Sequence, residues 1–187
     1  DLGCDQIIIN SHFEHLKIYE MINERKDKNL IKLIYEEEIL DTGGGVKNAI
    51  PYFVYDDIIV INSDVFWINQ NIDDVTLLIK NYFQFNFSQL LLVDQNNAFG
   101  LSKNNGDFSL QNNFVNRYNH GDKIIYYSGL QIINSNIFNN FSDKKFSFNL
   151  VWDSLIKEGK LCGKVMKSKW FHVGDIKGLS TARKLIA

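Results

Sequence analysis

The sequence predicts an α/β fold: a mixed, mostly parallel β-sheet with helices on both faces. Short apolar runs alternate with segments of helical periodicity through the first half of the chain, and several of these runs end in a polar residue. No linker or internal repeat interrupts the pattern. The 187 residues are 45% hydrophobic and 22% charged, which suits one globular domain with its own core. We therefore expect a single domain over residues 1–187.

The first half is expected to alternate strands with helices. The apolar run 6–10 predicts a buried parallel strand. Ser11 is expected to cap the next helix, with Glu14 completing a capping box. The further elements expected here are a helix over 12–25, a strand over 31–35, a glycine-rich loop at 43–45, a short helix over 46–49, a strand over 58–61, a helix over 73–85 and a strand over 90–93.

After Asp94 the pattern changes to strands joined by Asn/Gly turns. Gly159 stands where a helix C-cap glycine is expected. The elements expected in this half are strands over 106–110, 114–115 and 124–133, helices over 134–141 and 149–158, a strand over 161–166 and a closing helix over 176–186.

Polar residues at strand ends indicate the ligand site, because ligands of open α/β sheets bind outside the carboxyl ends of the strands. Asn10, Asn62, Asp64 and Asp94 all stand at such ends. Asp64 suits a Mg²⁺ ligand, since this ion favours one or two carboxylates together with phosphate oxygens. Capping of the next turn is an equally good interpretation of Asp64.

A second feature is the segment Asp41-Thr42-Gly43-Gly44-Gly45. Three glycines would leave backbone N–H groups bare, and the N-terminus of a following helix favours negative charge. A nucleotide could therefore approach closely. A flexible turn is the alternative, and the segment matches neither the Walker A nor the Rossmann fingerprint.

Five motifs in register resemble one family. They are Leu40-Asp41-Thr42-Gly43-Gly44-Gly45, Asn62-Ser63-Asp64, Gly106-Asp107-Phe108, Tyr127-Ser128-Gly129-Leu130 and Trp170-Phe171-His172-Val173-Gly174. Their order and spacing resemble the nucleotidyl transferase family, which makes nucleotide sugars. The chain looks most similar to its N-acetylmuramic acid 1-phosphate uridylyltransferase and mannose-1-phosphate guanylyltransferase-like branch. The resemblance covers nearly the whole chain and implies the Rossmann-like fold of nucleotide-diphospho-sugar transferases.

The resemblance also implies roles for individual residues. Asp64 looks like the main Mg²⁺ ligand and the catalytic residue. For His12, a place at the start of a capped helix weighs equally with a place in the nucleotide pocket. Asn10, His12, Thr42, Gly43, Gly44, Gly45 and Asn62 resemble the nucleotide-binding positions, and Asp107, Gly129 and Trp170 the sugar-phosphate side.

The implied reaction transfers NMP from a nucleoside triphosphate to a sugar 1-phosphate, with Mg²⁺ as cofactor. Neither nucleic acid nor a membrane is expected as a partner, because the net charge is -2 and no apolar run reaches the roughly 18 residues that span a bilayer. Cys4 and Cys162 are expected to be inert buried thiols. Two lone thiols suit the cytoplasm better than a disulfide framework.

The chain departs from the family at two places. The family opens with a strand and a glycine-rich loop that grips the triphosphate. We expect both to be missing here, and a separate N-terminal polypeptide could supply them. Many members also place an Asp where this chain has His172, and imidazole is a poor Mg²⁺ ligand. Asp175 is the alternative second ligand.

Two further questions stay open. Arg117 and Lys123 lie in the region of the sugar phosphate, although solvated surface charges are the better interpretation. Three other functions are also considered: an inactive fragment or pseudoenzyme of the same family, a GT-A-like glycosyltransferase, and a nucleotide-binding regulatory module. The single carboxylate of Asn62-Ser63-Asp64 counts against the glycosyltransferase, which usually holds its metal through Asp-x-Asp.

Overall fold

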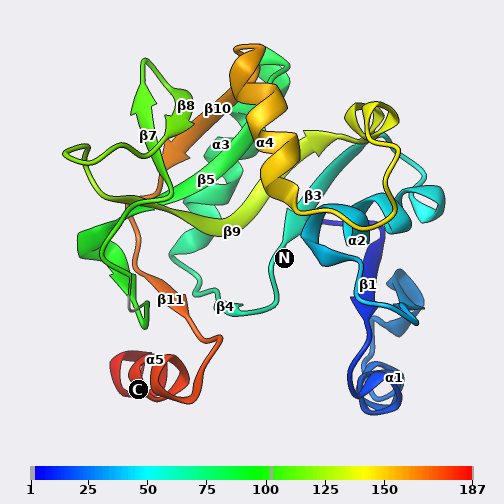
Figure 1. The fold of residues 1–187 in the computed structure, drawn as a ribbon. Coiled ribbons are helices and arrows are strands. Elements are labelled where there is room, and N and C mark those ends of the chain that lie inside the picture. Colours follow the sequence, from blue (N-terminus) through cyan, green and yellow to red (C-terminus); the bar gives the residue numbers. More distant parts are fainter. Residues whose placement is uncertain (1–2, 102, 187) are drawn as a thin grey trace. The chain divides into compact units, whose positions relative to one another are not determined.

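The computed structural model describes residues 3–101 and 103–186, which form two compact units (Figure 1). Unit 1 holds the described residues up to Asp56 together with Asn134–Asp153, and unit 2 holds Asp57–Ile133 and the described residues from Ser154 onward. The α/β class that the sequence predicts is confirmed. None of the described helices is both long and apolar enough to cross a membrane.

Unit 1 contains a two-stranded parallel sheet of β1 (Ile7–Ser11) and β2 (Ile31–Tyr35), in which Ile7 lies opposite Ile31 and Ser11 opposite Tyr35. The parallel direction was predicted correctly, but burial was not: only Ser11 of β1 is buried. A sheet of two strands cannot cover both of its faces. The helical elements of this unit are α1 (His15–Asn23), η1 (Lys28–Leu30), α2 (Asp41–Ala49), η2 (Ile50–Tyr52), η4 (Ser135–Asn140) and the first part of α4 (Phe148–Lys157).

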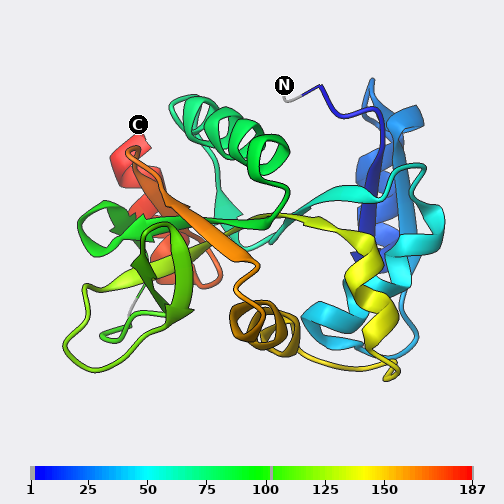
Figure 2. The same ribbon diagram turned by 90° about the horizontal axis from the view of Figure 1, so that it is seen from above.

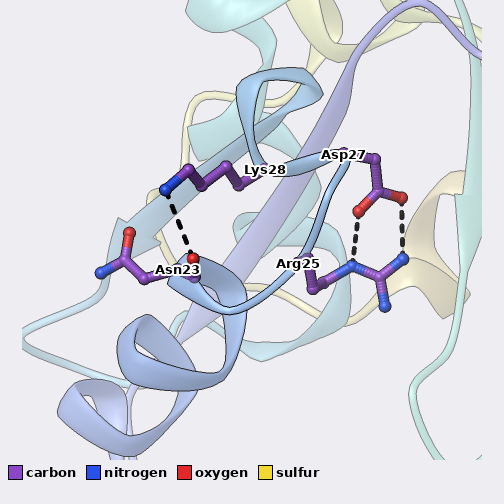
Figure 3. A network of polar contacts seen from close by, with 4 residues as sticks. All are labelled: Asn23, Arg25, Asp27 and Lys28. Carbon is purple, nitrogen blue, oxygen red and sulfur yellow. Dashed lines mark hydrogen bonds and ion pairs between the residues drawn. The ribbon is translucent and has the colours of Figure 1, made fainter.

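The predicted capping box before α1 is wrong. Ser11 is the last residue of β1, and its hydroxyl lies 2.7 Å from Nδ1 of His15 and donates to the Ile34 carbonyl at 3.1 Å. Glu14 precedes the helix in the left-handed conformation, and no side chain caps it. The segment after α1 is drawn in Figure 3. There Arg25 donates to both carboxylate oxygens of Asp27 at 2.7 Å.

The core of unit 1 is aromatic. Phe138 contacts the rings of Phe141, Phe146 and Phe148, and the Phe148 ring lies 5.4 Å from that of Trp152. Lys47 of α2 crosses to donate to the carbonyl of Phe141 and, at 3.3 Å, to that of Ser142. These contacts join the 134–153 segment to α2.

Unit 2 is built on a six-stranded sheet of order β3-β9-β5-β10-β8-β7. Strands β5 and β10 run parallel, whereas β9 is antiparallel to β5 and β8 is antiparallel to β10 and β7. The sheet is thus mixed, with more antiparallel pairing than the sequence predicts. The strands are β3 (Asp57–Ile61), β5 (Ser88–Asp94), β7 (Phe108–Gln111), β8 (Phe114–Arg117), β9 (Ile125–Asn134) and β10 (Leu161–Val165).

Helix α3 (Asn71–Phe85) packs on β5, as Figure 2 shows from above. Its buried face includes Val75, Leu78 and Tyr82, and the apolar residues 90–93 of β5 are fully buried. This helical spacing against a continuous apolar strand is the pattern that the sequence predicted. Cys162 of β10 is buried as expected, but Cys4 in unit 1 is exposed, so its predicted burial is wrong.

A second, three-stranded sheet of unit 2 has the order β4-β11-β6 and carries site residues. Strand β11 pairs antiparallel with β4 and parallel with β6. Its elements are β4 (Val65–Phe66), β6 (Ala98–Phe99) after η3 (Gln95–Asn97), and β11 (Trp170–His172), which is followed by α5 (Ile176–Ile186).

Candidate functional site

Asp64 ends a short turn that is fixed at both sides. The turn leaves β3 at Asn62, whose N–H donates to the Gly129 carbonyl at 2.8 Å. The Asp64 carbonyl accepts from the N–H of Val173, also at 2.8 Å. The carboxylate itself stays accessible, with 46% of the side chain exposed. Two backbone hydrogen bonds therefore fix a partly exposed carboxylate in the turn after β3.

His172 meets this carboxylate. Its Nε2 lies 3.4 Å from Oδ2 of Asp64, while the other ring nitrogen, Nδ1, is buried with no hydrogen-bond partner among the described residues. This arrangement requires glycine at position 174, because a Cβ on Gly174 would lie 2.8 Å from Cε1 of His172 and 3.4 Å from the Asp64 Cβ. Burial, with a smaller contribution from the Asp64 charge, raises the pKa of Tyr127 far above its ordinary value. An imidazole, a carboxylate and a neutral phenol thus share this edge of unit 2.

Asp175, the alternative second metal ligand, accepts a hydrogen bond from the helix that follows it. Its Oδ1 accepts from the N–H of Gly178 at 2.6 Å, so the side chain caps the first turn of α5. In the part of the chain that the structure describes, no three His, Cys, Asp or Glu side chains gather into a metal-binding group. The protein donors brought together are therefore Asp64 and His172, and any cation there would need further ligands from substrate.

Gly129 is set by the backbone of β9. It has φ +85°, and a Cβ would lie 3.1 Å from both the Asn62 Cβ and the Val65 Cγ1. The pairing of β9 with β5 shifts register at this point. Trp170 is buried and donates from its indole N–H to the Ser128 carbonyl at 2.7 Å. Gly129 and Trp170, two of the three residues that resemble sugar-phosphate positions, therefore shape the bulge of β9 next to the Asp64 turn.

Asp107 uses both carboxylate oxygens within unit 2. One forms an ion pair with Lys103 and the other accepts from the N–H of Tyr127 at 3.1 Å. Of the two cations considered for the sugar phosphate, Arg117 lies over the Phe108 ring at 5.0 Å. The other, Lys123, pairs with Asp94 and holds the pKa of that carboxyl below its ordinary value.

In unit 1, Asn10 lies in a small polar group at the ends of β1 and β2. Its Nδ2 donates to Oε1 of Glu36 at 2.6 Å and to the Gly45 carbonyl at 3.0 Å. The other Glu36 oxygen accepts from the N–H of Leu40 at 3.5 Å. We did not predict Glu36, although the signal was there: it directly follows β2, Asn10 lies next to the last residue of β1, and strand ends are where ligands are expected.

His12 lies outside any helix, because α1 begins at His15, so its interpretation as the start of a capped helix is wrong. Its Nδ1 is 2.7 Å from the Glu36 carbonyl, and its ring is parallel to that of Tyr35 at 6.4 Å. The ring is thus fixed beside the polar group of Asn10 and Glu36.

The glycine triplet is not a loop, which corrects the sequence-based expectation. Gly43, Gly44 and Gly45 are buried inside α2. The N–H groups of Gly43 and Gly44 both lie 3.0 Å from the Phe146 carbonyl that accepts them, and the Thr42 hydroxyl accepts from the Phe148 N–H at 2.9 Å. These two amides are therefore used within the protein. The glycines are needed for packing, because a Cβ on Gly43 would lie 2.5 Å from the Phe146 ring.

Comparison with known proteins gives relatives by sequence and by structure. No protein-family model matches the sequence. The N-acetylmuramate alpha-1-phosphate uridylyltransferase of Caulobacter vibrioides is 25% identical over 180 residues, which are 92% of this chain and 74% of the relative.

Among solved structures, HddC from Yersinia pseudotuberculosis complexed with GMP-PN has a TM-score of 0.77 at 24% identity, covering 99% of this chain and 80% of that chain. The inositol-1-phosphate CTP transferase from T. maritima has a TM-score of 0.74 at 10% identity, covering 98% and 76%. These likenesses show the fold. The sequence relative thus supports the resemblance to the nucleotidyltransferase family, and the solved structures confirm the predicted fold.

Proposed function

We propose that the chain belongs to an enzyme that transfers NMP from a nucleoside triphosphate to a sugar 1-phosphate. The observation that carries the proposal is the meeting of Asp64 and His172 beside a rigid strand end. The fold supports it, because the relatives with this fold include nucleotidyltransferases of phosphorylated small molecules. A phosphate oxygen of the sugar 1-phosphate attacks the α-phosphorus, the bond between the α-phosphorus and its bridging oxygen to the β-phosphate breaks, and pyrophosphate leaves.

Asp64 and His172 are the residues that would hold a divalent cation. When bound, such an ion neutralises charge on the transferring phosphoryl group. The carboxylate of Asp64 fits Mg²⁺, which was the cofactor predicted, and substrate oxygens would complete the shell. The imidazole of His172 fits Mn²⁺ or a later first-row ion better than Mg²⁺. Apart from charge, this reaction requires mainly that the two substrates be held in line.

The polar group of unit 1 is the proposed nucleotide side. Because the Asn10 Nδ2 is engaged by Glu36 and Gly45, the Oδ1 of Asn10 is left to accept from the nucleotide. Thr42 and the glycines act by placing α2, and Gly45 lies directly beside this group: a Cβ there would lie 3.2 Å from Oε1 of Glu36. His12 holds the backbone of Glu36.

On the sugar-phosphate side we propose Asp107, Gly129 and Trp170 as residues that shape the site, while Asn62 stays a proposed nucleotide-binding position. Gly129 and Trp170 do so through the backbone of β9, and Asp107 through the Tyr127 N–H. Both cysteines are free, which suits a cytoplasmic enzyme. A separate N-terminal polypeptide carrying the phosphate-binding loop remains our proposal for a further partner.

Pyrophosphate release tests the proposal. The chain, alone and with a supplied N-terminal segment of the family type, is offered UTP, GTP, CTP, dTTP or ATP with a panel of sugar 1-phosphates and either Mg²⁺ or Mn²⁺. We expect release that needs both substrates and that falls by at least about 100-fold in Asp64→Asn. Asp122→Asn, which changes a partly exposed loop carboxylate of the same unit, is the matched control.

Absence of release under all of these conditions would contradict the proposal and favour the pseudoenzyme or the nucleotide-binding module. Consumption of a nucleotide sugar with transfer of its sugar, and no pyrophosphate chemistry, would favour the glycosyltransferase instead.

A further inference from the structure

The loop between β10 and β11 is held by an anchor that no functional assignment above uses. Asp74, in the first turn of α3, is 9% exposed, and no cation pairs with it among the described ion pairs. Its Oδ1 accepts from the N–H of Lys167 at 3.0 Å, and its Oδ2 accepts from the N–H of Ser168 at 3.1 Å and from the Ser168 hydroxyl at 2.5 Å. A buried carboxylate is stable without a counter-ion only when donors of this kind surround it.

Asn71 completes the anchor from the same turn of α3. This side chain is 2% exposed, and its Nδ2 donates to the Ser168 Oγ at 2.6 Å and to the Lys169 carbonyl at 2.9 Å. Its Oδ1 accepts from the N–H of Ile68 at 2.7 Å, which ties the same residue to the segment before α3. We call Asn71 and Asp74, with residues 167–169, the loop clamp.

The loop clamp ends where β11 begins, and β11 carries His172. In the pairing of β11 with β4, His172 lies opposite Val65, the residue after Asp64. This pairing therefore decides whether the imidazole faces the carboxylate. Strands of two and three residues specify their register weakly, and a slip by one residue would turn His172 to the other face of the sheet. Contacts outside the two strands must fix it.

We propose that Asp74, with Asn71, is a positioning residue that sets the register of β11 and so holds His172 opposite Asp64. Anchors at three points support this. The loop clamp fixes the chain before Trp170, the indole of Trp170 is fixed to the Ser128 carbonyl, and the N–H of Val173 is fixed to the Asp64 carbonyl. The proposal rests on the proposed function only insofar as the positioned pair binds a cation.

The test compares Asp74→Asn with Asp73→Asn. Both residues lie in the first turn of α3, so the charge change and its effect on the helix dipole are matched, but Asp73 is exposed. In Asp74→Asn, the new side-chain N–H groups would face the N–H groups of Lys167 and Ser168, so that donor would meet donor. We expect the imidazole NMR signals of His172, assigned with His172→Gln, to shift in metal-free Asp74→Asn and to stay in place in Asp73→Asn. Ser168→Ala, which removes a single bridging hydroxyl, should shift the His172 signals less than Asp74→Asn does. If Asp74→Asn does not fold, the shift in Ser168→Ala is the test of the positioning role.

Mn²⁺ binding followed by EPR gives the second readout. We expect the Kd for Mn²⁺ to rise about tenfold in Asp74→Asn relative to Asp73→Asn, as misplacement of one ligand implies. Unshifted His172 signals in a folded Asp74→Asn, or in Ser168→Ala if that variant has to decide, would overturn the positioning role. If the wild-type chain shows no Mn²⁺ binding that depends on Asp64, the cation part of the proposed function fails, while the NMR comparison still tests the loop clamp.

Discussion

We expect His172 to decide which cation the candidate site prefers. Its Nε2, 3.4 Å from the Asp64 carboxylate, offers nitrogen where a carboxylate would offer oxygen. We expect His172→Asp to lower the ratio of Mn²⁺ to Mg²⁺ affinity about tenfold, because Mg²⁺ prefers oxygen donors and imidazole suits later ions. Competition of Mg²⁺ against EPR-detected Mn²⁺ measures this ratio. His120→Asp, in an exposed loop of the same unit, should leave it unchanged, and an equal change in both variants would contradict the ligand role of His172.

Gly129 is the residue that lets the Asp64 turn approach β9. We expect Gly129→Ala to lower the free energy of unfolding by about 2–4 kcal/mol, since the left-handed backbone and the close contacts with Asn62 and Val65 both oppose a Cβ. Urea denaturation measures it. Gly121→Ala is the control, because Gly121 also has positive φ but its Cβ would meet nothing within 4 Å, so only about 1–2 kcal/mol should be lost. Equal losses would mean that the approach to Asn62 and Val65 contributes nothing.

At the scale of elements, α2 is helical although three consecutive glycines lie within it. Alanine normally stabilises a helix by about 1 kcal/mol relative to glycine. We expect the opposite for Gly44→Ala, a net loss of about 1–3 kcal/mol in the free energy of unfolding, because the new Cβ would overlap the backbone carbonyl of Lys144. The Cβ of Gly45→Ala would lie 3.2 Å from Oε1 of Glu36 and 3.9 Å from Nδ2 of Asn10, both side-chain atoms, so this substitution should cost less. Urea unfolding of the two variants checks this order, and a stabilised Gly44→Ala would refute the packing role.

Gly45→Ala has a second expected effect, on nucleotide binding. The added methyl group lies beside the Glu36 oxygen that Asn10 contacts. We therefore expect a weaker binding of nucleoside triphosphate, by about threefold to tenfold, from displacement of this hydrogen-bonded pair. Titration calorimetry with UTP and GTP measures it, and Gly159→Ala, whose Cβ meets nothing within 4 Å, serves as the control. Unchanged affinity in Gly45→Ala would argue against the proposed nucleotide side.

At the scale of the whole molecule, the two units should differ in their response to alkali. Burial raises the pKa of Tyr126, Tyr127 and Cys162, all of which belong to unit 2. A group with a raised folded pKa holds its proton where the unfolded chain releases it. Its stabilising contribution is full below the unfolded pKa, about 9 for Cys and about 10 for Tyr, and is lost as the pH rises further.

We therefore expect the stability of unit 2 to fall above about pH 9, by about 1.4 kcal/mol per pH unit for each group that titrates only in the unfolded chain. Hydrogen exchange of unit 2 amides at a series of alkaline pH values, corrected for the intrinsic rate, measures the loss. Tyr127→Phe should reduce the slope, whereas Tyr55→Phe, an exposed tyrosine of unit 1, is the control. If Tyr127→Phe left the dependence of stability on pH unchanged, the raised pKa of Tyr127 would not be a cause of the loss.

Local pattern was sufficient for most elements. The apolar run of β5, the helical spacing of α3 and the C-cap glycine after α4, Gly159 with φ +65°, are decided by contacts between near neighbours. For the same reason the strand-end rule located Asn10, which lies near the end of β1, and Asp64, which lies in the turn that follows β3. The prediction of one domain over residues 1–187 stays a prediction, beside the two compact units that the contacts define.

The α/β class, the strands of the two-stranded and six-stranded sheets and the carboxylate after β3 follow from the sequence alone, because each depends on the pattern of a few consecutive residues. The short strands β4, β6 and β11 were not predicted. The helical state of Gly43–Gly45 depends on tertiary contacts, since the carbonyl of the distant Phe146 accepts from the amides of Gly43 and Gly44. Only the tertiary structure brought His172 to Asp64 and left Asp175 to cap α5. Contacts between residues far apart in the chain leave no periodic signal in either segment, which is why local pattern could propose these residues but could not choose between them.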